Sequence, residues 1–296
     1  MLKLLTSLIF ILNLSFATHA KTLPIAHRGA SAYAPENTIS SIKKAIELGS
    51  KFIEIDVHMT KDGEVVAIHD STIDRTSNYS GSVADFTIAQ LRGHDFGTWF
   101  SKEFSKEKIP TLKEVLKVLT SESILIIELK YGADTYPEIE KKIVDTVVKM
   151  GLSKNVILKS FSYEILNTFE KIAPNIDRLY CTFWGNSWLT IDNFLRFKGI
   201  FDRGSFKYLQ VHKFFLTKDL VDKAHEKGIK VVVWDVHDKE SMKEFQSMGV
   251  DLLNQIIQIM LLRFKRIPNH LRNLSHKCIL SFTDIHLNFI IIFKLF

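Results

Sequence analysis

The stretch Lys51–Asp70, KFIEIDVHMTKDGEVVAIHD, contains an apolar run that two acidic residues interrupt. Phe52–His58 has the composition of a β-strand, and Glu54 and Asp56 stand two positions apart within it. Side chains of a strand alternate between its two faces, so both carboxylates point to the same side. Two like charges buried together are unfavourable unless a cationic partner is supplied. The stretch therefore predicts a strand that carries a charged site, and His69 follows at the end of the next apolar run.

Strand-like runs recur along the chain and alternate with helical patterns. We expect strands at 23–27, 52–58, 124–130, 156–161, 178–183, 208–212 and 230–236, and an eighth near Val250. Helical patterns occupy 38–48, 111–119, 138–150, 163–172 and 218–227. This alternation predicts a parallel sheet, and its number of strands favours a TIM (β/α)8 barrel. The alternative is a doubly wound open sheet, but no Gly-rich fingerprint follows the first strand.

The segment 71–110 interrupts the alternation, because it holds turn residues and no clear helix–strand unit. We interpret it as a small insertion on the rim of the barrel, after the second strand. No internal repeat or linker divides 21–251, which is long enough for one large core. Most of the aromatic side chains in the insertion are expected to form a small core of their own. The alternative contacts for a substrate are Tyr79, Trp99 and Phe100.

Residues 1–20 have the layout of a secretory signal peptide. Lys3 is followed by an apolar stretch at 8–14 and by the small residues Ala17 and Ala20. The alternative is an N-terminal membrane anchor, although the apolar stretch is short for a span of ~20 residues. We therefore expect the protein to be exported, either to the periplasm or to the medium.

The charge and the cysteines exclude several classes of protein. The chain holds 39 basic and 33 acidic residues, a net charge of +6. Residues 252–296 contribute +5 and Lys3 contributes +1, so 21–251 is neutral and gives no reason to expect a nucleic-acid partner. The two cysteines, Cys181 and Cys278, lie in regions of different character, and we expect neither a disulfide nor a zinc site from them.

Polar residues gather where the predicted strands end, and in a barrel the active site lies at the carboxyl ends of the strands. The strand ends present His27 with Arg28, Glu54 with Asp56, His69, and Glu128 with Lys130. A divalent cation would neutralise three carboxylates at one rim. All-oxygen ligands suit Ca²⁺ or Mg²⁺ better than Zn²⁺. Each motif is weak alone, because acids and histidines are common at strand ends. Their joint occurrence in this order predicts an active site.

Several motifs resemble those of the glycerophosphodiester phosphodiesterases, namely IAHRGASAYAPENT, IEIDVHMTKDGEVVAIHD, DRTSNYSG, IPTLKEVL, IIELK and LKSF. The resemblance runs from about Ile25 to Asp251 and implies a TIM barrel with a small insertion after the second strand. It implies hydrolysis of glycerophosphodiesters, such as glycerophosphocholine, to glycerol 3-phosphate and an alcohol. It also implies a divalent cation, which is typically calcium in exported bacterial relatives and magnesium in others.

Carried over position by position, the resemblance assigns roles to the predicted rim residues. The implied metal ligands are Glu54, Asp56 and Glu128, the implied catalytic histidines are His27 and His69, and the implied phosphate-facing cations are Arg28 and Lys130. Histidine suits this reaction, because it titrates near neutral pH and can deprotonate a nucleophile or protonate a leaving alkoxide. Which histidine is the acid, and whether water or the substrate's own glycerol hydroxyl attacks, stays open.

Two further positions complete the comparison with the family. Trp234 resembles the tryptophan of the family's W-T-V-N segment, a candidate floor for the glycerol moiety. Asp235 and His237 replace the threonine and the asparagine, so the pocket differs there. We expect Asn37 to cap the following helix or to orient the first loop. The alternative function on the same fold is phospholipase D-like cleavage of lysophospholipids or sphingomyelin.

Residues 252–296 depart from the family pattern. After Asp251 the family continues with its last strand and a T-D-x-P-type turn, whereas here Ile, Leu and basic residues accumulate. Reading the codons of 254–261 from their third base permits Ser-Asp-Tyr-Pro-Asp-Tyr-Ala, which resembles that turn. We therefore expect a frameshifted tail, a lost last strand, open edges on the first and seventh strands, and little activity. The alternative is an amphipathic tail at a membrane surface.

Overall fold

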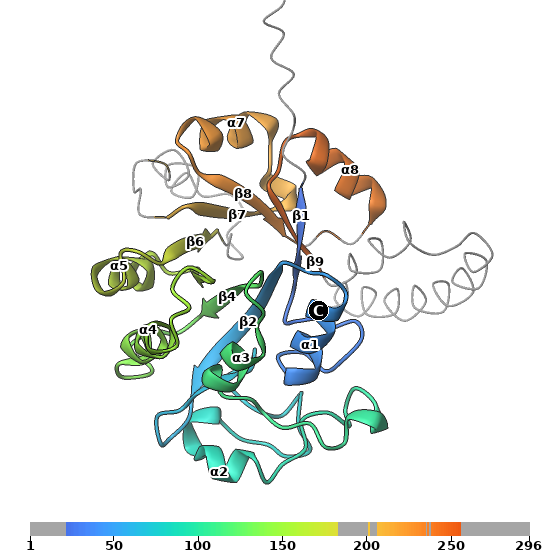
Figure 1. The fold of residues 1–296 in the computed structure, drawn as a ribbon, viewed down its shortest axis with the longest axis vertical. Coiled ribbons are helices and arrows are strands. Elements are labelled where there is room, and N and C mark those ends of the chain that lie inside the picture. Colours follow the sequence, from blue (N-terminus) through green and yellow to red (C-terminus); the bar gives the residue numbers. More distant parts are fainter. Residues whose placement is uncertain (1–21, 183–200, 202–205, 235, 237, 256–296) are drawn as a thin grey trace, which may run out of the picture.

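The structure, a computed structural model, describes residues 22–182, 201, 206–234, 236 and 238–255. Within them, parallel strands form a ring and helices surround it (Figure 1). The strands are β1 (Leu23–Ala26), β2 (Phe52–Met59), β3 (Val65–Ala67), β4 (Ile124–Leu129), β5 (Val156–Ser160), β6 (Asp177–Cys181), β7 (Tyr208–His212), β8 (Lys230–Trp234) and β9 (Leu252–Gln255). The helices are α1 (Ile39–Glu47), α2 (Ile88–Leu91), α3 (Leu112–Val118), α4 (Ile139–Lys149), α5 (Tyr163–Ile172), α7 (Lys218–Glu226) and α8 (Lys239–Ser247). The expected signal peptide and most of the atypical tail lie outside the described residues.

Eight of the strands close into a barrel. Neighbouring strands follow the order β1, β9, β8, β7, β6, β5, β4, β2, and β1 pairs in turn with β2. All of these pairings are parallel. The TIM barrel predicted from the alternating pattern is therefore confirmed.

The prediction of a lost last strand is wrong. β9 pairs with both β1 and β8, so neither of these strands has an open edge. Two apolar residues of β9 pack on the two faces of the sheet. Leu252 faces the barrel interior, and Leu253 packs on the helix side. It is complete at Gln255, before most of the atypical tail begins.

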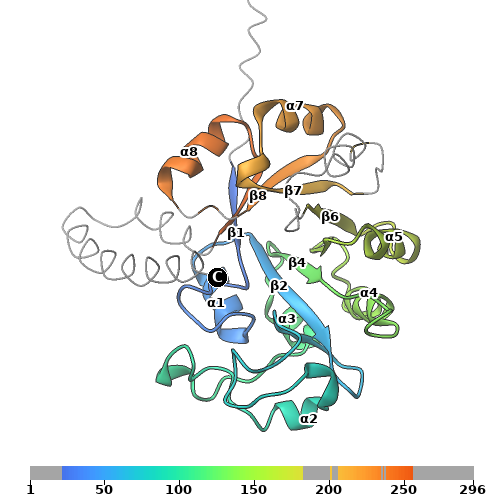
Figure 2. The same ribbon diagram turned by 180° about the vertical axis from the view of Figure 1, so that it is seen from behind.

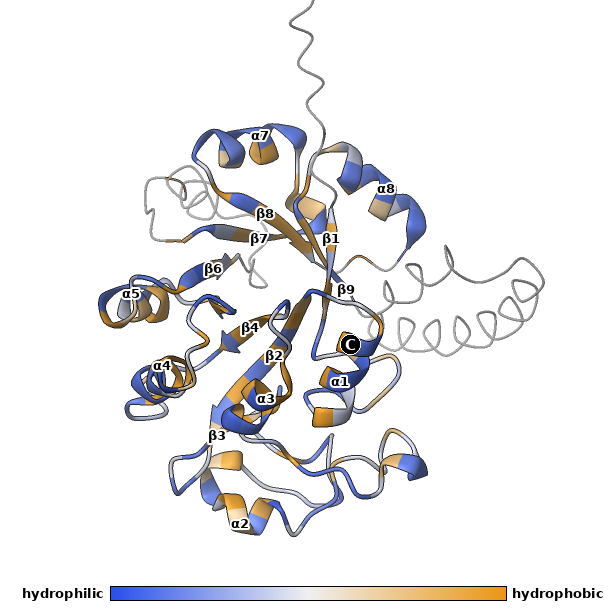
Figure 3. Cartoon of the chain, viewed as in Figure 1, coloured by the Kyte–Doolittle hydropathy of each residue, from blue (hydrophilic) through white to orange (hydrophobic). Residues whose placement is uncertain are grey.

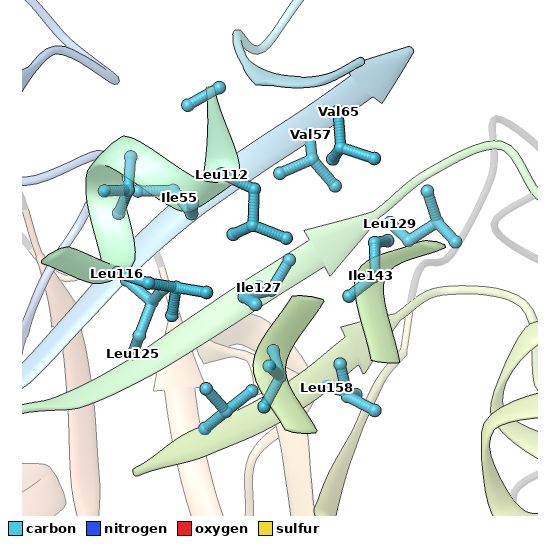
Figure 4. Close-up of a cluster of buried hydrophobic side chains, with 14 of the residues drawn as sticks. Ile55, Val57, Val65, Leu112, Leu116, Leu125, Ile127, Leu129, Ile143 and Leu158 are labelled. Carbon is cyan, nitrogen blue, oxygen red and sulfur yellow. The ribbon is translucent and has the colours of Figure 1, made fainter. Parts of the chain in front are cut away.

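Alternate residues of the strands face the helices and the barrel interior. Figure 4 shows Leu112 and Leu116 of α3 and Ile143 of α4 gathered against Ile127 and Leu129 of β4. The interior is filled by Ile25, Phe52, Ile126, Ile157, Leu179, Tyr208, Val232 and Leu252. Both faces of the sheet are thus covered, as a parallel sheet requires, and Figure 3 shows the hydrophobic residues concentrated on the strands and inner helix faces.

Among the described α-helices, all but α4 begin at a capping side chain. Thr38 caps α1 and Thr111 caps α3, each in a capping box with the residue three positions later. Within the described part of the chain, none of the helices has the length and apolar character needed to cross a membrane.

The predicted insertion follows β3, which pairs antiparallel with β2. It contains α2 and the short 3-10 helices Val83–Asp85 and Lys102–Phe104, and it lies beside α1 and α3 (Figures 1 and 2). Hydrogen bonds from Ser40 to Glu107 and from Arg92 to Glu114 join it to these helices. A buried cluster lies under it and comprises Val66, Ile68, Ile73, Val83, Leu91, Phe96 and Ile109. The expectation that most of the aromatic side chains form this core is wrong, because Phe96 is buried in it and Phe86 packs against it, whereas Tyr79 and Trp99 are exposed.

Candidate active site

Charged side chains replace apolar ones inside the barrel near its carboxyl end. Asp56 of β2, Glu128 of β4 and Lys159 of β5 lie opposite one another in register. Glu54 lies two positions before Asp56 and faces the same interior. All four residues are nearly inaccessible, with exposed fractions of 1 % for each β2 acid, 4 % for Glu128 and 2 % for Lys159. The two β2 acids therefore point to one side and are buried, as the strand pattern predicts.

The three predicted metal ligands come together in space. One oxygen from each of Glu54, Asp56 and Glu128 lies within 4.8 Å of the other two. Three carboxylate oxygens at this spacing form a donor set that a hard divalent cation such as Ca²⁺ or Mg²⁺ prefers.

Three cationic side chains balance the three carboxylates. Lys130 Nζ contacts Asp56 Oδ1 and lies 2.8 Å from Glu128 Oε1. Arg28 Nε lies 3.5 Å from Asp56 Oδ2. Lys159 Nζ contacts the cluster from the interior. The two buried acids of β2 are therefore paired with cations of the protein itself. These cations come from three different strands or strand ends.

The close packing of opposite charges shifts the pKa values of Asp56 and Lys159 most strongly. Burial raises the pKa of Asp56, but the charges of Lys130 and Arg28 outweigh it and hold that pKa far below its usual range. Burial lowers the pKa of Lys159, but Glu128 and Glu54 outweigh it and raise that pKa well above its usual value. Asp56 and Lys159 are therefore both ionised at neutral pH.

Sequence reasoning missed Lys159, although the residue lies within one of the motifs. Its Nζ is 2.9 Å from Glu54 Oε1 and 2.6 Å from Glu128 Oε2. The available signal was a lysine inside an apolar strand, two positions after the interior residue Ile157.

The loop after β1 brings His27 and Arg28 to the cluster. Arg28 and Gly29 both have positive φ, 55° and 75°. This bend lets the Arg28 amide donate to Glu54 Oε2 at 3.0 Å and places His27 Nε2 3.9 Å from the same oxygen. Position 29 requires glycine, because a Cβ there would lie 2.4 Å from Ser41 Oγ. Burial lowers the pKa of His27, against the opposing charge of Glu54.

Asn37 fastens the same loop to β2. Its Nδ2 donates to Asp56 Oδ2 at 3.0 Å, and its Oδ1 accepts from the Asp56 amide at 3.1 Å. The residue is buried and has φ of 57°, a left-handed conformation that asparagine tolerates. The expectation that Asn37 caps the following helix is wrong, since Thr38 is the cap. The expectation that it orients the first loop is confirmed.

His69 stands at the start of a ladder of charged hydrogen bonds. Its Nδ1 lies 2.6 Å from Asp70 Oδ1, and Asp70 Oδ2 accepts from Arg75 Nε at 2.7 Å. The Arg75 guanidinium donates to both oxygens of Glu36 at 2.8 Å, and Arg28 Nη1 donates to Glu36 Oε1 at 2.8 Å. The ladder joins the insertion, the first loop and the two predicted catalytic histidine segments. The sequence analysis had given no role to its middle members.

His58 lies within hydrogen-bonding distance of the backbone of His69. His58 is fully buried, its Nε2 lies 3.2 Å from the carbonyl oxygen of His69, and its Nδ1 lies 2.8 Å from the Tyr136 hydroxyl. It follows Asp56 on the same face of β2 by the two-residue period. That period is the signal by which the sequence could have identified it.

Trp234 lies at the same rim, at the end of β8. Its ring packs edge-on to His212 with centroids 4.9 Å apart, and the Phe161 ring lies at 6.3 Å. Its Nε1 is buried and has no hydrogen-bond partner among the described residues. The departures from the family pattern at Asp235 and His237 lie outside the described residues.

A closed parallel barrel with acids, histidines and cations at its carboxyl rim defines an enzyme of the TIM-barrel class. The chain belongs to the glycerophosphoryl diester phosphodiesterase family, whose sequence model matches residues 27–253. It is accordingly a hydrolase of the phosphodiesterase class.

Individual relatives agree with this membership. The chain is similar to the glycerophosphodiester phosphodiesterase of Caldanaerobacter subterraneus subsp. tengcongensis, with 38% identity over 236 residues, 78% of this chain and 92% of the relative. Among solved structures it is similar to an Oleispira antarctica phosphodiesterase in complex with the product sn-glycerol-3-phosphate, with 27% identity and a TM-score of 0.68 over 81% of this chain and 96% of that one. A glycerophosphodiester phosphodiesterase from Agrobacterium tumefaciens has 25% identity and a TM-score of 0.69, over 82% and 99% of the two chains.

Proposed function

We propose that this chain hydrolyses glycerophosphodiesters to sn-glycerol 3-phosphate and an alcohol, with His27 and His69 as the general acid–base pair. The observation that carries the proposal is the placement of both histidine segments around one buried carboxylate cluster. His27 Nε2 lies 3.9 Å from Glu54, and the ladder from His69 ends at Arg28, beside Asp56. The related phosphodiesterase with bound sn-glycerol-3-phosphate supports the product.

We further propose that Glu54, Asp56 and Glu128 hold a divalent cation. Their donor set fits one, because three carboxylate oxygens lie within 4.8 Å of one another. When bound, the cation would stabilise negative charge on the non-bridging phosphate oxygens. We favour calcium over magnesium, because calcium accepts irregular carboxylate cages whereas magnesium demands near-ideal octahedral geometry.

The protein's own groups divide the remaining work. Asp70 accepts from Nδ1–H of His69, which fixes the tautomer and leaves Nε2 as the atom that exchanges a proton with the reacting groups. The side chains of Arg28 and Lys130 are 19 % and 21 % exposed, so each stays partly accessible at the rim, where its charge would attract the phosphodiester anion. Trp234 would support the glycerol moiety at the far side of the rim.

The histidine roles are tested by His27→Ala and His69→Ala. Each should lower kcat for glycerophosphocholine by roughly 10²-fold or more, the usual scale for lost general acid–base help. Circular dichroism and thermal unfolding should stay close to those of the unaltered protein. The matched control is His94→Ala, since His94 stacks on the exposed Tyr79 of the insertion and lies outside the cluster. Full turnover by His69→Ala would show that the assignment of roles is wrong.

The cation is tested by chelation. Turnover should vanish in excess EDTA and return with calcium at a lower concentration than with magnesium. Unchanged turnover in EDTA would remove the metal from the mechanism, and recovery with magnesium alone would reverse the preference.

A substrate panel separates this proposal from phospholipase D-like activity on the same fold. Tyr79 and Trp99 are 55 % and 40 % exposed on the insertion, and such side chains suit contact with an apolar chain. We expect choline release from glycerophosphocholine and none from lysophosphatidylcholine or sphingomyelin. Faster cleavage of either lipid would favour the alternative.

A further inference from the structure

Lys159 is a cation that the proposed reaction does not use. Among the described residues it is the one lysine in the buried core, and its 2 % exposure prevents contact with a substrate at the mouth. Its Nζ lies 2.9 Å from Glu54 Oε1 and 2.6 Å from Glu128 Oε2. Two of the three proposed metal ligands therefore already share a full positive charge.

The strand register holds this ammonium in place. Lys159 lies directly opposite Glu128 on the neighbouring strand, and β5 continues into Ser160, whose hydroxyl donates to the Leu129 carbonyl at 2.7 Å. The side chain cannot leave for solvent without opening the barrel interior. A divalent cation that binds Glu54 and Glu128 must therefore share them with a fixed like charge.

We propose that Lys159 is an internal counter-ion that competes with the divalent cation: it keeps Glu54 and Glu128 paired in the metal-free enzyme and weakens metal binding to them. The inference rests on the proposed metal role of these carboxylates. Charge accounts for both effects. Two buried carboxylates without a cation repel each other and destabilise the fold, and the affinity of a carboxylate site for a hard cation rises with its net negative charge.

Lys159 is therefore a positioning residue that sets the metal concentration at which the site fills. With it, the three carboxylates meet three protein cations and the empty site is neutral. Without it, the cluster gains a net negative charge that only the bound ion relieves. Lys159 thus raises the stability of the metal-free enzyme and lowers the affinity of the site for the metal.

The test compares Lys159→Met, which keeps most of the length and removes the charge, with Lys159→Gln, which keeps hydrogen-bond donors. The control is Lys207→Met, because Lys207 makes an exposed ion pair with Asp177 at 2.8 Å. The readouts are the melting temperature in EDTA and the calcium dissociation constant by titration calorimetry. We expect both Lys159 variants to melt lower than the unaltered enzyme in EDTA. Their calcium dissociation constants should fall by about tenfold or more, a conservative figure for removing a like charge a few ångströms away.

The outcomes separate this inference from the proposed function. If the unaltered enzyme binds calcium and the Lys159 variants bind it equally or more weakly, Lys159 is no competitor and the metal site stands. If neither the unaltered enzyme nor any variant binds calcium or magnesium, both proposals fail. If the variants unfold in EDTA but fold in calcium, the ion has replaced the lysine, which supports the inference. If they stay unfolded in saturating calcium, Lys159 has a packing role and the inference is overturned.

Discussion

Asn37 offers the sharpest test of how the first loop organises the site. Asn37→Gly removes both side-chain hydrogen bonds to Asp56 and keeps the left-handed backbone at φ 57°. A hydrogen bond to a charged group is worth ~1.5–3 kcal/mol, and a buried amide left without a partner costs about 1–3 kcal/mol. Because these effects overlap, we expect the free energy of unfolding to fall by roughly 3–5 kcal/mol. Asn37→Ala adds the strain of a Cβ at positive φ and should lose about 1 kcal/mol more.

The assay is urea unfolding in EDTA at pH 7, so that metal binding does not contribute. Asn78→Gly is the matched control, because Asn78 accepts one hydrogen bond from the Asp95 amide at an exposed position and should lose under ~1.5 kcal/mol. Calcium titration of Asn37→Gly should also show weaker binding, since Asp56 loses the group that orients it. Stability of Asn37→Gly within about 0.5 kcal/mol of the unaltered protein would refute the reasoning, being far below the expected loss. An Asn37→Ala variant more stable than Asn37→Gly would refute the backbone part of it.

Three further perturbations address the ladder, the charges and the core. Arg75→Gln cuts the connection between the insertion and Glu36 and should lower kcat by about 10-fold with little change in KM, as loss of an orienting group does; a change in KM alone would contradict this. The pKa values of Asp56, Glu128 and Glu36 are lowered by paired cations from ordinary values of 3.8, 4.5 and 4.5, so the unfolded chain takes up protons first as the pH falls. The stability that these three groups contribute is complete above pH about 4.5 and is lost below it. A shallower decline of the melting temperature in EDTA should begin already below pH about 6.5, because the pKa values of the buried His27 and His58 are lowered and the unfolded chain takes up their protons first. The melting temperature should then drop steeply under pH about 4, and one that holds to pH 3 would contradict the reasoning. Phe169→Ala, at a fully buried position, should cost about 3–5 kcal/mol of unfolding free energy and leave kcat per folded molecule unchanged; a loss near zero would mean that the α5 side of the core repacks.

Much of the barrel could be predicted from the sequence because its strands have a simple composition. The apolar runs with inward acids at Glu54 and Glu128 fall within β2 and β4, where they were expected. α8 was missed, since only Met242 and Phe245 of that helix are buried and the rest of it is polar. A helix with so narrow an apolar face gives little periodic signal.

The candidate site could be predicted only as far as strand ends and motifs reach. His27, His69 and the three carboxylates were identified because each stands at a strand end or in a recognisable motif. Lys159 was missed because its role depends on the register of β5 against β4, which a single sequence does not fix. The ladder through Asp70 was missed for a similar reason, since its members come from segments whose packing is tertiary.

The closure of the ring by β9 has a consequence for how the chain is made. Thr22 hydrogen-bonds to the carbonyl of Val250, 228 positions away, and β1 lies beside a strand that ends at Gln255. A ribosome makes about 5–20 residues per second, so β1 waits roughly ten seconds or more for its neighbour. During that time the nascent chain is an open sheet with a bare edge at each end, the form that chaperones hold and proteases cut. Synthesis that stops before Asp251 would release a chain with every proposed catalytic and metal-binding residue and no means of closing around them.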